Sequence, residues 1–243
     1  MLQVCLNGAR GPGDSAAIPM SPESLAESAA RAVAAGAGEV RVHPRTPCGG
    51  TSLSPRVLTP VLSSVRAAVG TPVPVTTAVA AEPDPGRRVE RIRSWAVLPD
   101  LVSVDWHEPG AEEVAGALLE RGIGVEAGLW ARTDGHERFA RSPLAPRVRR
   151  VLVKVPYPPA GSGAGEASRS FLAGLELPPV VPVLLHGEDG SAWPVLRLAR
   201  RLGLVARIGL EDTLLLPDDT RARSNAELVA AALTGRRDFP DTT

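Results

Sequence analysis

The stretch Val205–Thr213, with the sequence VARIGLEDT, is the most informative segment for the fold and the candidate site of this chain. Its apolar first half predicts a short strand that carries Arg207 and ends at two adjacent carboxylates, Glu211 and Asp212. Residues two apart on a strand share a face, so Arg207 and Glu211 are expected on the same side. An arginine beside two carboxylates suits a metal ligand and a general base at one point. A surface turn with a salt bridge is the alternative interpretation.

Seven further segments of the same kind precede this stretch, and each is followed by a predicted helix. Two of those helices begin with Ser-Pro pairs, at 21–22 and 54–55, and the last begins with a capping box at 224–227. Eight alternating units predict a parallel sheet closed into a (β/α)8 TIM barrel, as a single domain over residues 1–243. An open doubly wound sheet is the alternative, although no GxGxxG motif follows a strand. The predicted strands are Leu2–Gly8, Glu39–Arg45, Pro72–Thr77, Leu101–His107, Gly124–Trp130, Val148–Val155, Val181–His186 and Val205–Thr213.

The composition narrows the class of protein. The chain has 243 residues, of which 44% are hydrophobic, enough for a large core. Its formal net charge of zero argues against a nucleic-acid or membrane-surface partner. No run of eighteen apolar residues is present, and the first residues lack the features of a signal peptide, so we expect a cytoplasmic protein. The two cysteines, Cys5 and Cys48, fit no metal-finger spacing.

Polar residues gather at the predicted carboxyl ends of the strands, which is where barrel enzymes have their active sites. Each of these residues alone has an ordinary structural explanation, such as a helix cap or an ion pair. Their shared position is the stronger observation, because convergent polar groups are what a site requires. The residues are Asn7, His43, Thr76, Thr77, Asp105, His107, Glu126, Lys154, His186, Glu211 and Asp212.

Several segments resemble one known family, that of the β-keto acid cleavage enzymes. They are CLNGAR, VHPR, GVEAGLW, LLHGE, RIGLEDTLLLPD and SNAELV, which together run from Cys5 to Val229. The resemblance implies a (β/α)8 barrel with a divalent metal, usually zinc. It also implies a Claisen-type acyl transfer, in which a β-keto acid and acetyl-CoA become acetoacetate and a new CoA thioester.

The resemblance also implies a role for each matching residue. Two histidines and a glutamate hold the metal in the family; His43 and Glu211 match two of them, but the first histidine falls on Arg41, which cannot ligate zinc. Asp212 matches the base that takes a proton from the keto acid, and Arg207 matches the arginine that orients it. The remaining expected site residues are Thr76 and Glu126 as catalytic groups, and Asn7, Thr77 and His186 as substrate-binding groups.

Two other functions stay open at this point. Lys154 is the only lysine in the chain, and a lysine on the sixth strand of a barrel would suit a Schiff-base lyase or aldolase. Alternatively, the barrel binds a keto acid or CoA compound with impaired turnover, because Arg41 replaces a metal ligand. Arg41 then either pairs with Glu211 in a bidentate way in the metal's place, or repels a divalent cation, or turns away and leaves His43, Glu211 and His186 to hold a weaker metal. In either case we expect small-molecule partners and assembly into a homo-oligomer.

Overall fold

Eight parallel strands form the centre of the molecule in the computed structural model, which describes residues 1–70, 75–78, 82–155, 163–178 and 181–234. Each strand pairs with the next, and β1 also pairs with β8, so the ladder of pairings closes on itself. The strands are β1 (Leu2–Cys5), β2 (Glu39–Arg41), β3 (Val75–Ala78), β4 (Leu101–Asp105), β5 (Gly124–Trp130), β6 (Arg150–Lys154), β7 (Val183–His186) and β8 (Val205–Ile208).

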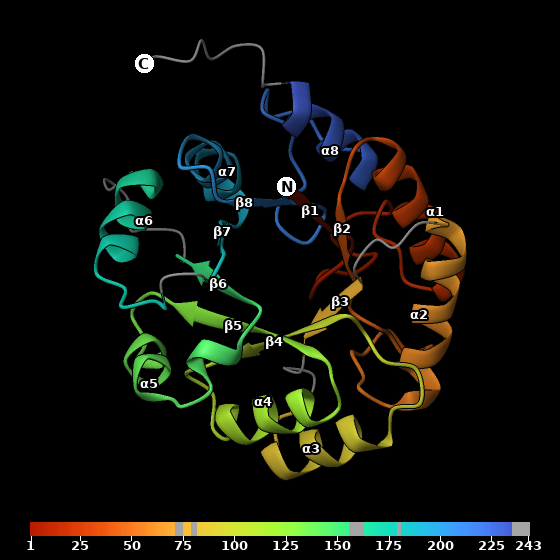
Figure 1. The fold of residues 1–243 in the computed structure, drawn as a ribbon. Coiled ribbons are helices and arrows are strands. Elements are labelled where there is room, and N and C mark those ends of the chain that lie inside the picture. The colour runs from red at the N-terminus through yellow and green to blue at the C-terminus, as the bar shows by residue number, and fades with distance from the viewer. Residues whose placement is uncertain (71–74, 79–81, 156–162, 179–180, 235–243) are drawn as a thin grey trace.

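Helices follow the strands and surround them (Figure 1). The apolar core lies between the strands and this outer layer of helices. Ser21 caps α1 through the backbone of Ser24, as the Ser-Pro pair predicts. The helices are α1 (Pro22–Ala34), α2 (Pro55–Val69), α3 (Pro85–Ser94), α4 (Ala111–Glu120), α5 (Gly135–Arg141), α6 (Ala164–Ala173), α7 (Ala192–Arg201) and α8 (Asn225–Thr234), with two short 3₁₀ helices, η1 (Ala145–Arg147) and η2 (Asp189–Ser191).

The strand register brings polar side chains together inside the ring of strands. Glu126 is the register partner of Ser103 on β4 and of Arg150 on β6, while Gln3 is the partner of Glu39. All five side chains are buried. Barrel interiors are usually filled with branched apolar residues, so this charged layer sets the molecule apart and positions groups close to its mouth.

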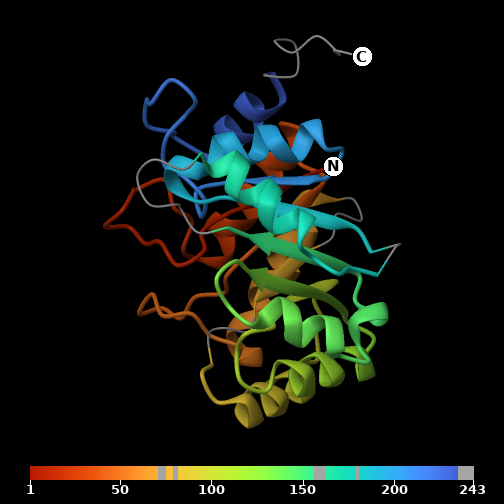
Figure 2. The ribbon, with the colours of Figure 1, turned by 90° about the vertical axis from the view of Figure 1, so that its left-hand side faces the viewer.

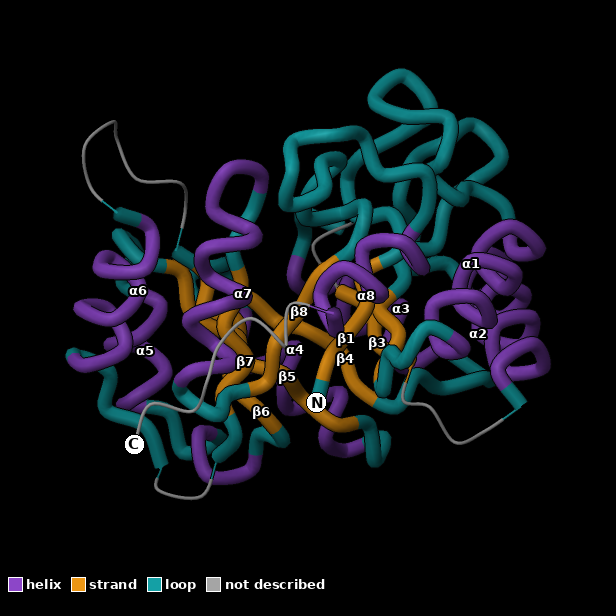
Figure 3. The backbone as a smooth tube through the Cα atoms, turned by 90° about the horizontal axis from the view of Figure 1, so that it is seen from above, coloured by secondary structure: helices purple, strands orange, loops and turns teal. Residues whose placement is uncertain are grey.

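The long loops after β1, β2 and β8 lie on one side of the sheet, at the carboxyl ends of the strands. Figure 2 shows the first of them in red and the last in blue on the same side, and Figure 3 shows loops gathered above the strands. Arg221 of the β8–α8 loop donates a hydrogen bond to the carbonyl of Asp14 in the β1–α1 loop, at 3.3 Å. These loops therefore form one continuous rim.

The parallel, alternating α/β architecture is confirmed, but six strands, β1, β2, β4, β6, β7 and β8, are shorter than the sequence indicated, and β2 and β8 differ most. Strand β8 ends at Ile208 rather than Thr213, because the amides of Asp212 and Thr213 both bond to the carbonyl of Gly209 and turn the chain. Strand β2 ends at Arg41 rather than Arg45. Glu211 thus lies in the turn and not on the strand, but it is still on the same side as Arg207, whose Nη2 lies 2.7 Å from Glu211 Oε1.

Part of the predicted third strand cannot be compared in the same way. Residues 72–74 lie outside the described residues, and strand β3 is described from Val75. Thr76 and Thr77 lie on β3, but their side chains are outside the described part of the chain. Among the helices that are described, none has both the length and the apolar character needed to cross a membrane.

Candidate active site

The turn after β8 places Asp212 beside Arg207 at the mouth. Both are buried, and Asp212 Oδ1 accepts hydrogen bonds from Arg207 Nε at 3.0 Å and Nη2 at 2.8 Å. His186, at the end of β7, donates a third hydrogen bond to the same oxygen from Nε2 at 2.8 Å. The aspartate is therefore held by three hydrogen bonds from two side chains on neighbouring strands, two of them from Arg207.

The other oxygen of Asp212 is left free. Oδ2 is buried and has no hydrogen-bond partner among the described residues. Burial raises the pKa of Asp212, but the charge of Arg207 and the contact with His186 outweigh it, so the pKa lies below the usual value. Asp212 is thus an ionised carboxylate with one anchored oxygen and one oxygen able to accept a proton from a ligand.

Glu211 and His43 meet next to this aspartate. His43 Nδ1 lies 3.4 Å from Glu211 Oε2, and neither atom has a hydrogen-bond partner among the described residues. Burial lowers the pKa of His43 to about 4, against the attraction of Glu211, so the imidazole is neutral at neutral pH. Burial raises the pKa of Glu211, but Arg207, His43 and Arg41 outweigh it and hold it well below its usual range.

Glycine is required where the β1–α1 loop passes this pair. Gly8 has φ of +56°, and a β-carbon added there would lie 2.1 Å from Glu211 Cγ. Asn7, beside it, bonds the backbone through both ends of its side-chain amide: Nδ2 donates to the carbonyl of His43, and Oδ1 accepts from the amides of His43 and Gly8. The structure therefore gives Asn7 a positioning role behind His43.

Arg41 joins the mouth to the barrel interior. Its Nη1 donates to Ser103 Oγ and to Glu126 Oε1, the latter at 3.0 Å, while its Nε lies 3.9 Å from Glu211 Oε2. Of the arrangements that the sequence left open, the bidentate pair between Arg41 and Glu211 is not formed, because Glu126 and Ser103 hold the guanidinium. Arg41 Nε is left without a hydrogen-bond partner among the described residues.

Glu126 is fully used by its neighbours. Arg150 Nε donates to its Oε2 at 2.7 Å, and the same guanidinium also bonds Glu39, which accepts from Gln3 as well. Burial raises the pKa of Glu126, but Arg150, Arg41 and Ser103 outweigh it and bring it to about 2. A carboxylate so strongly paired serves to fix Arg41 rather than to move protons.

The residues at this mouth do not fit the three-ligand zinc centre implied by the family resemblance. Catalytic zinc usually has three protein ligands, but only His43 and Glu211 face each other at the expected place. Both oxygens of Glu211 also lie near guanidinium groups, with Arg207 Nη2 2.7 Å from Oε1 and Arg41 Nε 3.9 Å from Oε2. Within the described residues no group of three or more His, Cys, Asp or Glu side chains is arranged to hold a metal ion.

Sequence reasoning missed the network that supports the site. The expected residues did not include Gln3, Glu39, Ser103 and Arg150, although their even spacing along predicted strands placed them on inward faces.

Lys154 forms its contacts on the other side of the mouth. Its Nζ lies 2.5 Å from Glu188 Oε1 and 3.9 Å from the centroid of the Trp130 ring.

Comparison with known families agrees with this chemistry. The family model for the beta-keto acid cleavage enzyme matches residues 1–126 and 170–239. The chain therefore belongs to the β-keto acid cleavage enzyme family, which confirms the resemblance found in the sequence. The matched residues include Asp212, Glu211, Arg207 and His43, but not Lys154. A search of curated proteins found no match.

Solved structures share the fold at low sequence identity. ObcA in its binary complex with oxaloacetate superposes with a TM-score of 0.69 and 16% identity over 90% of this chain, and ObcA in its ternary complex with a C4-CoA adduct and oxalate gives 0.70 and 16%. This chain spans 64% of the length of those ObcA chains. A native KDPGal structure matches with a TM-score of 0.58 and 16% identity, over 98% of this chain and 94% of that one. These similarities support the α/β barrel-like fold.

Proposed function

We propose that this protein, a (β/α)8 barrel enzyme over residues 1–243, transfers an acyl group between a β-keto acid and acetyl-CoA. In the overall reaction the keto acid's acyl group moves to the CoA sulfur, and the acetyl group joins the remaining carboxymethyl carbon to give acetoacetate. The family and the oxaloacetate and CoA-adduct complexes of ObcA support these substrate classes. The observation that carries the proposal is the free, buried Oδ2 of Asp212, whose other oxygen is held by Arg207 and His186.

Asp212 is the base in this proposal. Its Oδ2 takes a proton from the carbon between the two carbonyl groups of the keto acid, and the electron pair left behind becomes an enolate. Arg207 and His186 keep the carboxylate ionised and correctly turned, at the cost of some basicity. Asp212 is fully buried, and burial strengthens its electrostatic interactions with a bound substrate.

Arg41 supplies a second positive charge near the two carboxylates, in addition to Arg207. The Nε of Arg41 is the buried donor without a partner, and the guanidinium is fixed by Glu126 and Ser103. A preorganised donor of this kind stabilises charge that develops on a ketone oxygen. The proposal therefore retains a fixed cation where the family places its metal, and it requires no zinc.

The test is an exchange assay on protein dialysed against a chelator. Acetyl-CoA is mixed with each of a panel of β-keto acids, and acetoacetate and the new thioester are measured by mass spectrometry. We expect exchange with at least one keto acid and no gain on adding zinc. Exchange that disappears on chelation and returns with one zinc per chain would overturn the role of Arg41, and absence of exchange with every keto acid would overturn the function.

Arg41→His is the matched variant. It restores the third ligand type beside His43 and Glu211 and removes the nearby cation. We expect its zinc content, measured on the purified protein, to rise toward one per chain, while the unchanged protein stays near zero. Equal zinc content in the two proteins would contradict this explanation of the mouth.

A further inference from the structure

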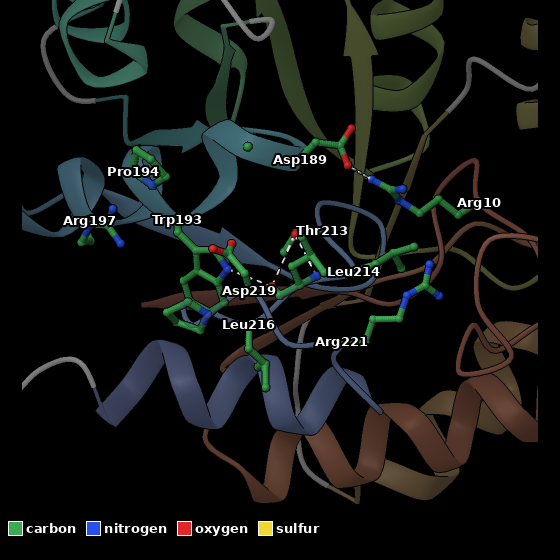
Figure 4. Close-up of a pocket in the computed structure, with 13 residues that line it drawn as sticks. Arg10, Asp189, Trp193, Pro194, Arg197, Thr213, Leu214, Leu216, Asp219 and Arg221 are labelled. Atoms are coloured by element: carbon green, nitrogen blue, oxygen red, sulfur yellow. Dashed lines mark hydrogen bonds and ion pairs between the residues drawn. The ribbon is translucent and has the colours of Figure 1, made fainter.

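A cavity of about 430 Å³ opens beside the candidate active site, between the loops that follow β7 and β8 (Figure 4). Thr213, which comes directly after Asp212, belongs to its lining, as does Arg10. Arg10 Nε also donates to the carbonyl of Glu211 at 3.1 Å. The cavity is thus joined by the chain itself to the two carboxylates of the site, and its size suits a small-molecule ligand.

Three arginines line this cavity, and two of them have donors to spare. Arg10 is paired with Asp189. Arg197, half-buried on α7, has no hydrogen bond or ion pair with any described residue. Within the same part of the chain, the side chain of Arg221 donates only to the carbonyl of Asp14. Figure 4 shows Arg10 and Arg221 on one side and Arg197 on the other, with Trp193 between them in this view. Guanidinium groups with free donors are suited to phosphate oxygens.

The walls of the cavity are held in place. Trp193 Nε1 donates to the carbonyl of Leu215 at 2.9 Å, and Leu215 forms a bridge with Arg221 across the β8–α8 loop. Two of the three non-glycine residues with positive φ in the described chain, Asp189 and Asp219, lie in its lining, with φ of 49° and 63°. Sparsely populated backbone conformations gather at ligand sites, where the surroundings must enforce them.

We propose that this cavity binds the phosphorylated nucleotide end of the CoA substrate. Barrels of this type commonly bind phosphate between the loops after their seventh and eighth strands, which are the loops that form this cavity. Arg197 and Arg221 contact the phosphates, Trp193 offers its ring to the adenine, and the thioester arm passes Thr213 toward Asp212. The proposal rests on the proposed function, because it takes CoA as the co-substrate.

Calorimetric titration with CoA tests this assignment. In Arg197→Gln and in Arg221→Gln we expect the Kd for CoA to rise about tenfold each, because a charged donor to phosphate is lost. The control is Arg201→Gln, which changes an exposed arginine of the same helix that does not line the cavity. Thermal melting checks that all three variants fold.

Fragments of CoA locate the contact. Adenosine 3′,5′-bisphosphate should lose affinity in the same two variants, whereas pantetheine, which lacks phosphate, should bind all proteins alike. An unchanged Kd for CoA in the Arg197→Gln/Arg221→Gln double variant would overturn the proposal, as would an equal loss for pantetheine.

The two proposals fail in different ways. If CoA binds with the expected dependence on Arg197 and Arg221, yet no keto acid gives acetoacetate, the cavity assignment stands and the acyl-transfer function falls. If acetoacetate forms, but these substitutions leave the KM for acetyl-CoA unchanged, the function stands and the cavity assignment falls.

Discussion

Two charged regions of the molecule are connected through Arg41. They differ in how completely their polar atoms are hydrogen-bonded. Inside the ring of strands, both oxygens of Glu126 and of Glu39 accept hydrogen bonds, mainly from Arg150. At the mouth, Glu211 Oε2, Asp212 Oδ2 and His43 Nδ1 are buried with no hydrogen-bond partner among the described residues. Buried polar groups are nearly always paired, so the mouth is where a ligand is expected.

The difference assigns a different task to each region. A fully paired network fixes side chains and resists change, while unpaired buried atoms keep their capacity for a substrate. Arg41 belongs to both regions, because its Nη1 is paired inside and its Nε is free at the mouth.

The largest effect is expected at the mouth, in Asp212→Asn. The amide keeps the shape of the carboxylate but removes its ability to take a proton. We expect kcat for acyl exchange to fall by about 10²–10⁴-fold in protein that still folds, with a lower thermal transition because the buried Arg207 loses a charged partner. The control is Asp134→Asn, an exposed aspartate whose side chain makes no helix cap. Activity within a factor of two of the unchanged protein would exclude Asp212 as the base.

The next effect is expected inside the ring of strands, in Glu126→Gln. This change leaves Arg41 and Arg150 buried with one carboxylate fewer, and such losses cost about 3–5 kcal/mol of stability. Denaturant unfolding measures the loss. Glu120→Gln serves as the control, since Glu120 is exposed and lies 3.8 Å from Arg93. Equal unfolding midpoints for the two variants would show that the interior network contributes little.

The same two regions show which features could be predicted from the sequence and which could not. The alternation of strands and helices was readable, because apolar periodicity and Ser-Pro helix starts are local signals. Glu211 and Asp212 were recognised by their position after an apolar segment, yet the turn that ends β8 at Ile208 was not, because it depends on two amides that bond to Gly209.

The partner of Arg41 could not be read from the sequence for a related reason. Glu211 and Glu126 were both near the mouth in the expected barrel, and the choice between them depends on the register of β4 and β5, which places Ser103 beside Glu126. Register between distant segments is set by tertiary packing rather than by local pattern.

A pH dependence of stability of about 2 kcal/mol is expected from His43 alone, in addition to any contribution from His186, whose pKa burial also lowers. The unfolded chain protonates His43 below about pH 6.5, but burial keeps the folded imidazole neutral until about pH 4. The free energy of unfolding therefore keeps its full value above pH 6.5 as far as His43 is concerned, and it falls as the pH drops toward 4. Between pH 7 and pH 5 the expected decrease is about 2 kcal/mol. Unfolding curves of the unchanged protein and His43→Gln at both values measure it, with His136→Gln as the control. A difference between pH 7 and 5 that His43→Gln leaves intact would contradict this origin.

The smallest effect is expected at Lys154. This residue lies across the mouth from Arg41 and belongs to neither of the two regions compared above. Its ammonium group contacts Glu188 and the face of Trp130, contacts typically worth about 1 kcal/mol or less at partly exposed sites. We expect Lys154→Gln to lower stability by no more than about 1 kcal/mol and to leave kcat within a few-fold. Incubation of the unchanged protein with a keto acid and borohydride, followed by intact-mass measurement, should give no adduct. A reduced adduct that is absent from Lys154→Gln would favour a Schiff-base lyase over acyl transfer, because only an amine nucleophile yields a product that borohydride can fix.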